Sequence, residues 1–210
     1  MSTSTQPTTL EPSHADSTPS ITPANAPRDT ATAMTYVTRL GTPSDAEQIS
    51  KLVGTTWSDL FGWSVSPQDL DTYINITLSP SSFESELAQS DKHYFICAAS
   101  SSSNDIQEEI LGVAQLVQNP TPPMDIPNSI ELQRLYAHPS THGTGLGQML
   151  ITKSKEKARE LGKSKIWLGV WEGNERGKRF YEKMGFETVG EKVFYAGESK
   201  RRDLIMCIEI

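Results

Sequence analysis

A short glycine-rich stretch, His142 to Gly147, carries the clearest chemical signal in this chain. It reads His-Gly-Thr-Gly-Leu-Gly and lies between a strand-like run over residues 129–137 and an amphipathic pattern over residues 145–161. Alternate glycines let the backbone approach a ligand closely, and the first turn of the following helix presents unpaired N–H groups to the same place. Such a loop is typical of a phosphate site.

Three known phosphate-binding loops can be compared with this stretch. A P-loop needs a Gly-Lys-Ser/Thr ending, but Gly147 is followed by Gln148 and Met149. A dinucleotide-binding fingerprint, Gly-x-Gly-x-x-Gly, would need glycine at position 148. The third is the pyrophosphate loop of acetyl-CoA-dependent N-acetyltransferases, Arg/Gln-x-x-Gly-x-Gly/Ala, which residues 142–147 match except at His142. A glycine-rich turn without a ligand is the alternative.

From Ser129 to Ile210 the chain closely resembles the GNAT superfamily of N-acetyltransferases, and within it the PaiA-type spermidine/spermine N-acetyltransferases. The likeness rests on the segments IELQRLYAHP, HGTGLGQML, KIWLGVWEGN, FYEKMGFETVG and DLIM, and it is weaker over residues 36–118. The resemblance implies an enzyme that uses acetyl-CoA as co-substrate, without a metal, and acetylates a polyamine or another small amine by direct transfer. A peptide or protein amine as acceptor, or a CoA-binding regulatory protein with little turnover, is the alternative.

The resemblance also assigns cofactor contacts. Backbone N–H groups of the loop would hold the pyrophosphate, and the residues concerned are His142, Gly143, Thr144, Gly145, Leu146, Gly147 and Gln148. Backbone groups of Leu135, Tyr136 and Ala137 would pair with the pantetheine amides, and one N–H among them would stabilise the oxyanion. Asn174 resembles a cofactor-binding asparagine, although its place before a helix also makes it a good N-cap.

Tyr181 is the expected catalytic residue and is also expected to contact the cofactor, beside the departing sulfur. A phenol has a reference pKa of about 10 and a thiol of about 8.5, so tyrosine can donate a hydrogen bond or a proton to the forming thiolate. Packing between helix and sheet is the alternative role.

The attacking amine must also lose a proton. Many relatives carry a glutamate where this chain has Gln133. Glu131 is therefore the candidate for a water-mediated base, or for attracting a cationic substrate, and an exposed strand-end acid is the alternative. On a regular strand Glu131, Gln133 and Leu135 would share one face.

The elements that would position these residues follow from apolar periodicity. Strands are expected over residues 36–40, 92–99, 110–118, 129–137, 165–170, 186–189 and 204–208, with a polar loop over residues 100–107. Helices are expected over residues 67–78, 81–89, 145–161 and 174–184, and another after Thr42 with Ile49, Leu52 and Val53 as its stripe. This order suits an α/β (α+β) GNAT fold, a mixed and mostly antiparallel sheet flanked by helices. In that fold the two central parallel strands, here ending at Ala137 and Val170, splay apart.

Acceptor contacts are expected from residues 57–63, from acidic side chains and from a loop over residues 195–203. Trp57, Phe61 and Trp63 would line an apolar or cation–π site, or would belong to the core or to a homodimer surface. The acids that could attract an oligoamine are Asp59, Asp69, Asp71, Glu84 and Glu86. Surface helices normally carry such acids, so this role has a simple alternative.

Composition limits the remaining classes. A formal net charge of −7 over 210 residues disfavours nucleic acid as a partner, and no apolar run is long enough to span a membrane. Cys97 and Cys207 are expected as buried thiols, and the four histidines lack metal-ligand spacing. Residues 1–33, rich in Ser, Thr, Pro and Ala, are expected to be a disordered tail before a domain over residues 34–210. Without a signal peptide's apolar core, the expected location is cytoplasmic, with the nucleus left open.

Overall fold

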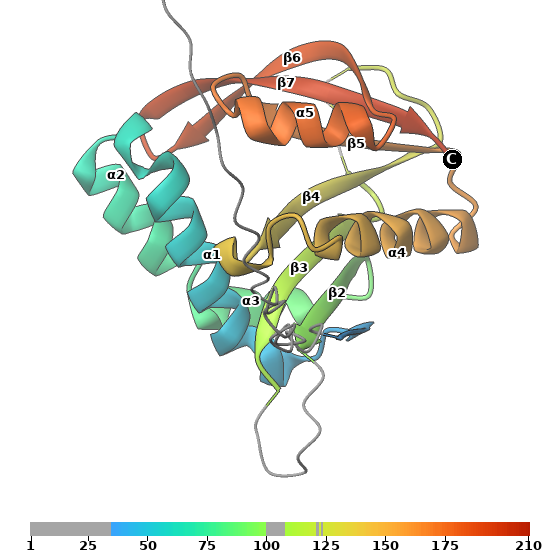
Figure 1. Ribbon diagram of the computed structural model, residues 1–210. Helices are drawn as coiled ribbons and strands as arrows, with labels where there is room; N and C mark the ends of the chain where they lie inside the picture. The colour runs from blue at the N-terminus through green and yellow to red at the C-terminus, as the bar shows by residue number, and fades with distance from the viewer. Residues whose placement is uncertain (1–34, 100–107, 121, 123) are drawn as a thin grey trace, which may run out of the picture. The chain divides into compact units, whose positions relative to one another are not determined.

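A computed structural model describes residues 35–99, 108–120, 122 and 124–210, which form one sheet with helices on both faces (Figure 1). The tail predicted over residues 1–33 and the loop predicted over residues 100–107 lie outside the described residues. None of the helices in the described part combines the length and the apolar character that crossing a membrane requires.

The sheet has seven strands in the order β1-β2-β3-β4-β5-β7-β6. They are β1 (Tyr36–Leu40), β2 (Lys92–Ala99), β3 (Ile110–Val117), β4 (Ser129–Ala137), β5 (Lys165–Trp171), β6 (Glu187–Ala196) and β7 (Ser199–Glu209). Every neighbouring pair is antiparallel except β4 and β5, which run parallel. The predicted mixed, mostly antiparallel sheet is confirmed.

Helices α1 to α3 pack on one face of the sheet, and α4 and α5 pack on the other. Their bounds are η1 (Pro43–Asp45), α1 (Ala46–Phe61), η2 (Gly62–Ser64), α2 (Pro67–Thr72), η3 (Tyr73–Thr77), α3 (Pro80–Leu87), η4 (Pro139–Thr141), α4 (Leu146–Glu160) and α5 (Glu175–Lys183). The side chains of Ser66 and Ser79 cap α2 and α3 by accepting from the N–H groups of Asp69 and Ser82. Local capping chemistry therefore starts the helices where the sequence predicts them.

The apolar stripe of α4 forms the centre of one core. Leu146, Leu150 and Ile151 are buried there against strands β3 to β5, as the predicted amphipathic pattern requires. Gly112 of β3 faces the Leu146 side chain so closely that a β-carbon at position 112 would overlap it. Because α4 is held this tightly, its N-terminus has a fixed place relative to β4.

A β-bulge corrects one prediction about β4. Gln115 of β3 pairs with Arg134, but the next residue, Leu116, pairs with Leu132, so Gln133 is the extra residue. A bulge of one residue reverses the alternation of side chains beyond it. Leu132 and Leu135 consequently both pack in the core under α4. The prediction that Glu131 and Leu135 share a face is therefore wrong.

Strands β6 and β7 are longer than predicted, with 10 and 11 residues. They meet in a tight turn at Gly197, where φ is +60°. The acceptor loop predicted over residues 195–203 is therefore a β-hairpin. β6 is an edge strand in which polar residues alternate with apolar ones. A search for runs of apolar residues therefore finds only its beginning.

Candidate active site

Strands β4 and β5 pair at one end only. Their parallel ladder contains Ser129 with Lys165, Ile130 with Ile166, and Glu131 with Trp167. Beyond Glu131, β4 continues to Ala137 with its pairs on β3 alone. The backbone groups of residues 135–137 that point toward β5 are consequently free to pair with an added extended chain. This is the splay that the sequence predicts.

The glycine loop lies at the open end of this splay, between β4 and α4. Gly143 and Gly145 have φ values of +83° and +91°, which only glycine adopts readily. Gly147 serves another purpose, because a β-carbon there would lie 3.2 Å from Cζ of Phe180, so that ring of α5 would have to shift by a few tenths of an ångström. Backbone conformation and close packing therefore each require glycine in this loop.

The N-terminus of α4 offers unpaired donors. Gly145 is its N-cap and has no side chain to accept from the first turn. The N–H of Met149 donates to the carbonyl of Gly145 at 3.0 Å, so the N–H groups of Leu146, Gly147 and Gln148 precede the first intrahelical bond. Aligned N–H groups and the helix dipole make this end suitable for a phosphate.

His142 is a weaker anion ligand than the family's arginine. Burial lowers its pKa, and the charges of Arg176 and His138 lower it further, so the imidazole is mostly neutral at neutral pH. Arg176, in the first turn of α5, brings a permanent positive charge near the same loop. The sequence analysis missed Arg176, because no local pattern links it to a loop that lies about thirty residues earlier in the chain.

Tyr181 lies on the side of α5 that packs against the sheet. Its ring centre is 5.3 Å from that of Phe180 and 5.7 Å from that of Phe186. Burial raises the pKa of its phenol, which therefore stays protonated at neutral pH and can donate a hydrogen bond. Burial also raises the pKa of Tyr136, with the charges of Tyr73 and Tyr181 adding to the effect.

Asn174 has the local role that its position suggests. Its Oδ1 accepts a hydrogen bond from the N–H of Gly177 at 2.9 Å, which caps α5. The cap fixes the start of the helix that carries Tyr181. A contact between Asn174 and the cofactor stays a prediction.

Glu131 is buried at the point where β4 and β5 separate, with 9% of its surface exposed. The alternative that it is an exposed strand-end acid is therefore wrong. Its nearest cation is Lys192 of β6, with Nζ 3.8 Å from the carboxylate. Burial raises the pKa of Glu131, against the opposing charges of Lys192 and Arg134. A carboxylate whose pKa is raised toward neutrality suits proton transfer.

Two of the acids that were expected to attract an oligoamine, Glu86 and Asp69, bind other parts of the chain instead. Glu86 pairs with Lys92 at 3.1 Å and with Arg134, and it also accepts from Tyr94. Asp69 accepts from the backbone N–H groups of residues 198 and 199, which holds the turn of the β6–β7 hairpin onto α2. These carboxylates are partnered, so they have little capacity left for a polyamine.

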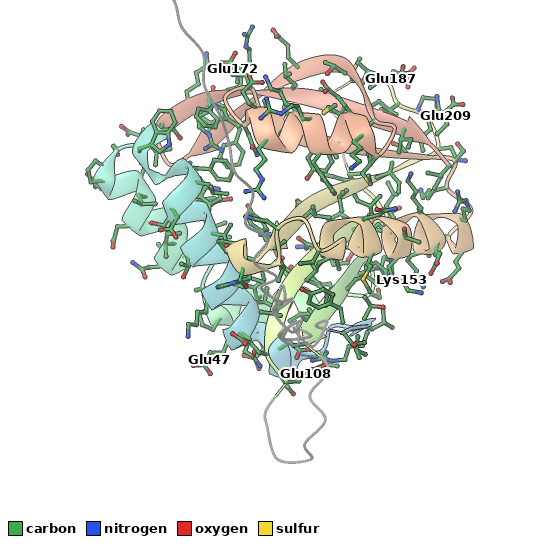
Figure 2. All side chains as sticks on the ribbon, in the orientation of Figure 1. Glu47, Glu108, Lys153, Glu172, Glu187 and Glu209 are labelled. Atoms are coloured by element: carbon green, nitrogen blue, oxygen red, sulfur yellow. The ribbon has the colours of Figure 1, made fainter. Side chains whose placement is uncertain are left out.

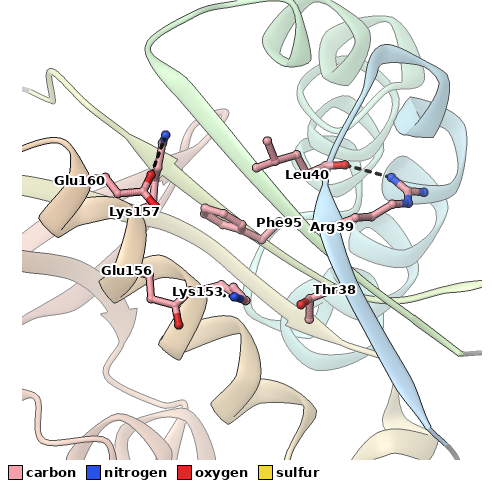
Figure 3. Close-up of a pocket in the computed structure, with 8 residues that line it drawn as sticks. All are labelled: Thr38, Arg39, Leu40, Phe95, Lys153, Glu156, Lys157 and Glu160. Carbon is pink, nitrogen blue, oxygen red and sulfur yellow. Dashed lines mark hydrogen bonds and ion pairs between the residues drawn. The ribbon is translucent and has the colours of Figure 1, made fainter.

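A surface hollow of about 280 Å³ lies between β1 and α4 (Figure 3). Lys153, Glu156, Lys157 and Glu160 line it from α4, and Thr38, Arg39, Leu40 and Phe95 line it from β1 and β2. None of these residues belongs to the predicted site. The hollow lies along the solvated side of α4, away from its N-terminus, and does not compete with the splay as a candidate.

Comparison with known proteins agrees with this geometry. Residues 51–186 match the model of the acetyltransferase (GNAT) family. The chain belongs to this family, and it is an N-acetyltransferase. A protein from Lactobacillus delbrueckii subsp. lactis, known as the uncharacterized N-acetyltransferase in the pepI 3' region, is 30% identical over 152 residues, or 72% of this chain and 84% of that protein.

Solved structures show the same fold. The PaiA N-acetyltransferase of Thermoplasma acidophilum, solved in complex with coenzyme A, is similar with a TM-score of 0.63 and 22% identity, over 84% of this chain and all of that one. A mutant of the spermidine N-acetyltransferase SpeG from Vibrio cholerae is similar with a TM-score of 0.58 and 18% identity, over 83% and 93% of the two chains. At these identities the likeness concerns the fold.

Proposed function

We propose that this chain transfers the acetyl group of acetyl-CoA directly to a primary amine within a ternary complex. One observation carries the proposal. β4 has a free backbone edge beyond Glu131, α4 begins with an uncapped N-terminus, and α5, whose Phe180 ring approaches Gly147 of α4, carries the protonated phenol of Tyr181. An extended pantetheine arm, a pyrophosphate and a departing thiolate each require one of these three features.

The residues of the loop and of β4 would hold the co-substrate. N–H groups of residues 143–148 would donate to the pyrophosphate, with the guanidinium of Arg176 supplying the charge that His142 lacks. Leu135, Tyr136 and Ala137 would pair with the pantetheine amides through their free edge. The N–H of Tyr136 or Ala137 would donate to the thioester oxygen, a contact worth about 3 kcal/mol in the transition state.

Two side chains would move the protons. Glu131 would accept a proton from the acceptor ammonium through water, so that the nitrogen lone pair forms a bond to the carbonyl carbon. The carbon–sulfur bond then breaks, Tyr181 would donate its proton to the thiolate, and the second proton lost by the nitrogen would restore the phenol. An N-acetyl amine, free coenzyme A and one released proton result. Cys97 does not suit an acetyl carrier, because it is buried and burial raises its pKa to about 11.

The acceptor we propose is a small primary amine. Polyamines are the acceptors that the resemblance implies, and the name of the Vibrio cholerae neighbour specifies spermidine. The partnered states of Glu86 and Asp69 weigh against a site built for several positive charges. Polyamines are therefore tested together with amines that carry a single positive charge.

A free-thiol release assay tests the proposal. The purified chain is given acetyl-CoA with polyamines, amino acids, aminoglycosides or peptides, and mass spectrometry identifies the acetylated product. We expect thiol release that depends on the amine and equals the N-acetyl product in amount. Calorimetric binding of acetyl-CoA with no product from any amine would contradict it and would favour a CoA-binding regulatory protein.

A further inference from the structure

Three buried polar atoms without partners lie on one face of β5 and β7. Among the residues that the structure describes, the buried side-chain atoms without a hydrogen-bond partner are Tyr36 Oη, Trp167 Nε1, Arg201 Nε and Asp203 Oδ1. The β5 and β7 ladder pairs Trp171 with Asp203 and Trp167 with Cys207, so the last three side chains share one face of the sheet. Trp167 lies four residues back along β5, in a separate apolar cluster with Ile126 and Ile205, whereas Arg201 and Asp203 are two residues apart on β7. Buried polar groups are normally paired, so two unpaired atoms of opposite charge on neighbouring side chains, Arg201 Nε and Asp203 Oδ1, call for a functional explanation.

Arg201 is held by aromatic rings rather than by a carboxylate. Its guanidinium carbon lies 4.8 to 5.5 Å from the ring centres of an aromatic cage formed by Trp57, Phe61, Trp171 and Phe194. Only 9% of its surface is exposed, and Nη1 donates to Ser64 Oγ at 3.2 Å. Aromatic faces stabilise the cation but do not accept its in-plane N–H bonds. Arg201 therefore keeps a buried N–H donor, on Nε, that has no acceptor among the described residues.

Asp203 provides the opposite charge two residues along β7. It is 6% exposed, and burial raises its pKa against the charges of Arg201 and Lys192. Lys192 is the partner of Glu131, at 3.8 Å, and no ion pair within 4.0 Å joins Arg201 to Asp203 in the described residues. Residues two apart on a strand have their α-carbons about 6 to 7 Å apart. The pair thus presents a positive and a negative group at a short, fixed spacing.

This pair borders the proposed reaction centre. Asp203 is paired with Trp171, the last residue of β5. Arg201 lies two residues before Asp203 on β7, beyond the end of β5 and toward the open end of the splay. Across that end, Arg201 is among the charges that oppose the burial-raised pKa of Tyr136, whose backbone belongs to the free edge of β4. A ligand on the pair would therefore lie beside the thioester.

We propose that Arg201 and Asp203 form the acceptor subsite for a short amino acid, with Arg201 binding its carboxylate and Asp203 binding its ammonium group. This assignment rests on the proposed function. A polyamine would be repelled by Arg201, and a simple anion would be repelled by Asp203. A zwitterion can instead pair its carboxylate with Arg201 and its ammonium group with Asp203. Hydrogen bonds between a carboxylate and a buried guanidinium are charge-assisted and therefore strong.

The sequence supplies a matched control for Arg201. Arg202 is the adjacent residue of β7, but it points to the opposite face and pairs with Glu191 at 3.3 Å and with Glu172. Glu172, labelled in Figure 2, lies between the end of β5 and the start of α5. Arg202→Gln removes the same charge from the same strand without touching the subsite.

Equilibrium binding to the complex with coenzyme A tests the subsite without any turnover. The ligands are glycine, 3-aminopropanoate, 4-aminobutanoate and 6-aminohexanoate, each beside its carboxamide. We expect the carboxylate to bind about 10- to 100-fold more tightly than the carboxamide at the best length. Arg201→Gln should abolish this preference and Arg202→Gln should keep it. Asp203→Asn should weaken both members of each pair equally.

The outcomes separate the two proposals. Equal binding of carboxylate and carboxamide at every length, no binding by any ligand, or a preference that survives Arg201→Gln would overturn the subsite. If Arg201→Gln does not fold, the comparison of ligands on the unaltered chain decides alone. Thiol release with the same compounds tests the proposed function independently. Selective binding without transfer would overturn the function, and transfer without carboxylate preference would overturn the subsite.

Discussion

Glu131 and Trp167 are the last residues that pair between β4 and β5, and the sheet opens immediately beyond them. The Glu131 carboxylate is buried at this point, so the only candidate base that the sequence offers on β4 sits where the two strands part. The Glu131–Trp167 pair thus marks both the start of the splay and the position of the candidate base.

Tyr181→Phe should lower kcat about 100-fold and leave the dissociation constant of acetyl-CoA almost unchanged. The phenol contributes by donating to the leaving sulfur, and general acid catalysis of this kind is worth about 10² or more in rate. Stopped assays for kcat and calorimetry for binding measure the two effects. Tyr195→Phe is the control, because its side chain is 60% exposed on β6 and, as the neighbour of Phe194 on the strand, points away from the side on which Phe194 contacts Arg201. Neither value should change. Equal kcat for Tyr181→Phe and the unaltered chain would remove the proposed acid.

Gly145→Ala should weaken acetyl-CoA binding, and Gly162→Ala should not. Both glycines have a left-handed backbone, with φ of +91° and +70°, and a β-carbon at either would meet no atom within 4 Å. Each substitution should therefore destabilise the fold by a similar amount, about 1 to 2 kcal/mol. Urea unfolding measures that common effect and calorimetry measures binding. Only Gly145 adjoins the phosphate donors, so equal losses of affinity in both variants would contradict the assigned loop.

Glu131→Gln should lower kcat about 100-fold at neutral pH and change the pH profile. Burial raises the pKa of Glu131, so activity of the unaltered chain should fall as the pH drops through a value above the usual range of a glutamate. The variant should lack that decline. Glu187→Gln, on the exposed β6 edge labelled in Figure 2, is the control. A decline in Glu131→Gln identical to that of the unaltered chain would assign the titration to another group.

Glu86→Gln should destabilise the fold by about 3 kcal/mol at pH 7, because it leaves the buried guanidinium of Arg134 without its ion pair. Burial would raise the pKa of Glu86, but Arg134 and the hydrogen bond from Tyr94 outweigh burial and lower it. A lowered pKa in the folded state means that the stabilisation is present above the unfolded-state pKa and is lost as the pH falls through the folded-state pKa. Urea unfolding between pH 7 and pH 3 should therefore show a smaller loss of stability in Glu86→Gln than in the unaltered chain. Parallel curves would show that Glu86 is not responsible.

Much of this molecule was accessible from local sequence. The bounds of β1, β2 and β4 agree with prediction, as do the glycine loop and the cap at Asn174. These features depend on backbone conformation and on hydrogen bonds between residues a few positions apart, which neighbouring side chains determine. The homodimer and the cytoplasmic location stay predictions.

The remaining features arise from contacts between distant segments. The bulge at Gln133 depends on register with β3, and the partnering of Glu86 depends on how α3 meets β2 and β4. Arg201 reads in the sequence as one of several cations near the C-terminus, yet it becomes a buried, partly unpaired guanidinium because α1, β5 and β6 enclose it. Burial and charge pairing depend on which surfaces pack together, and a linear pattern does not contain that information.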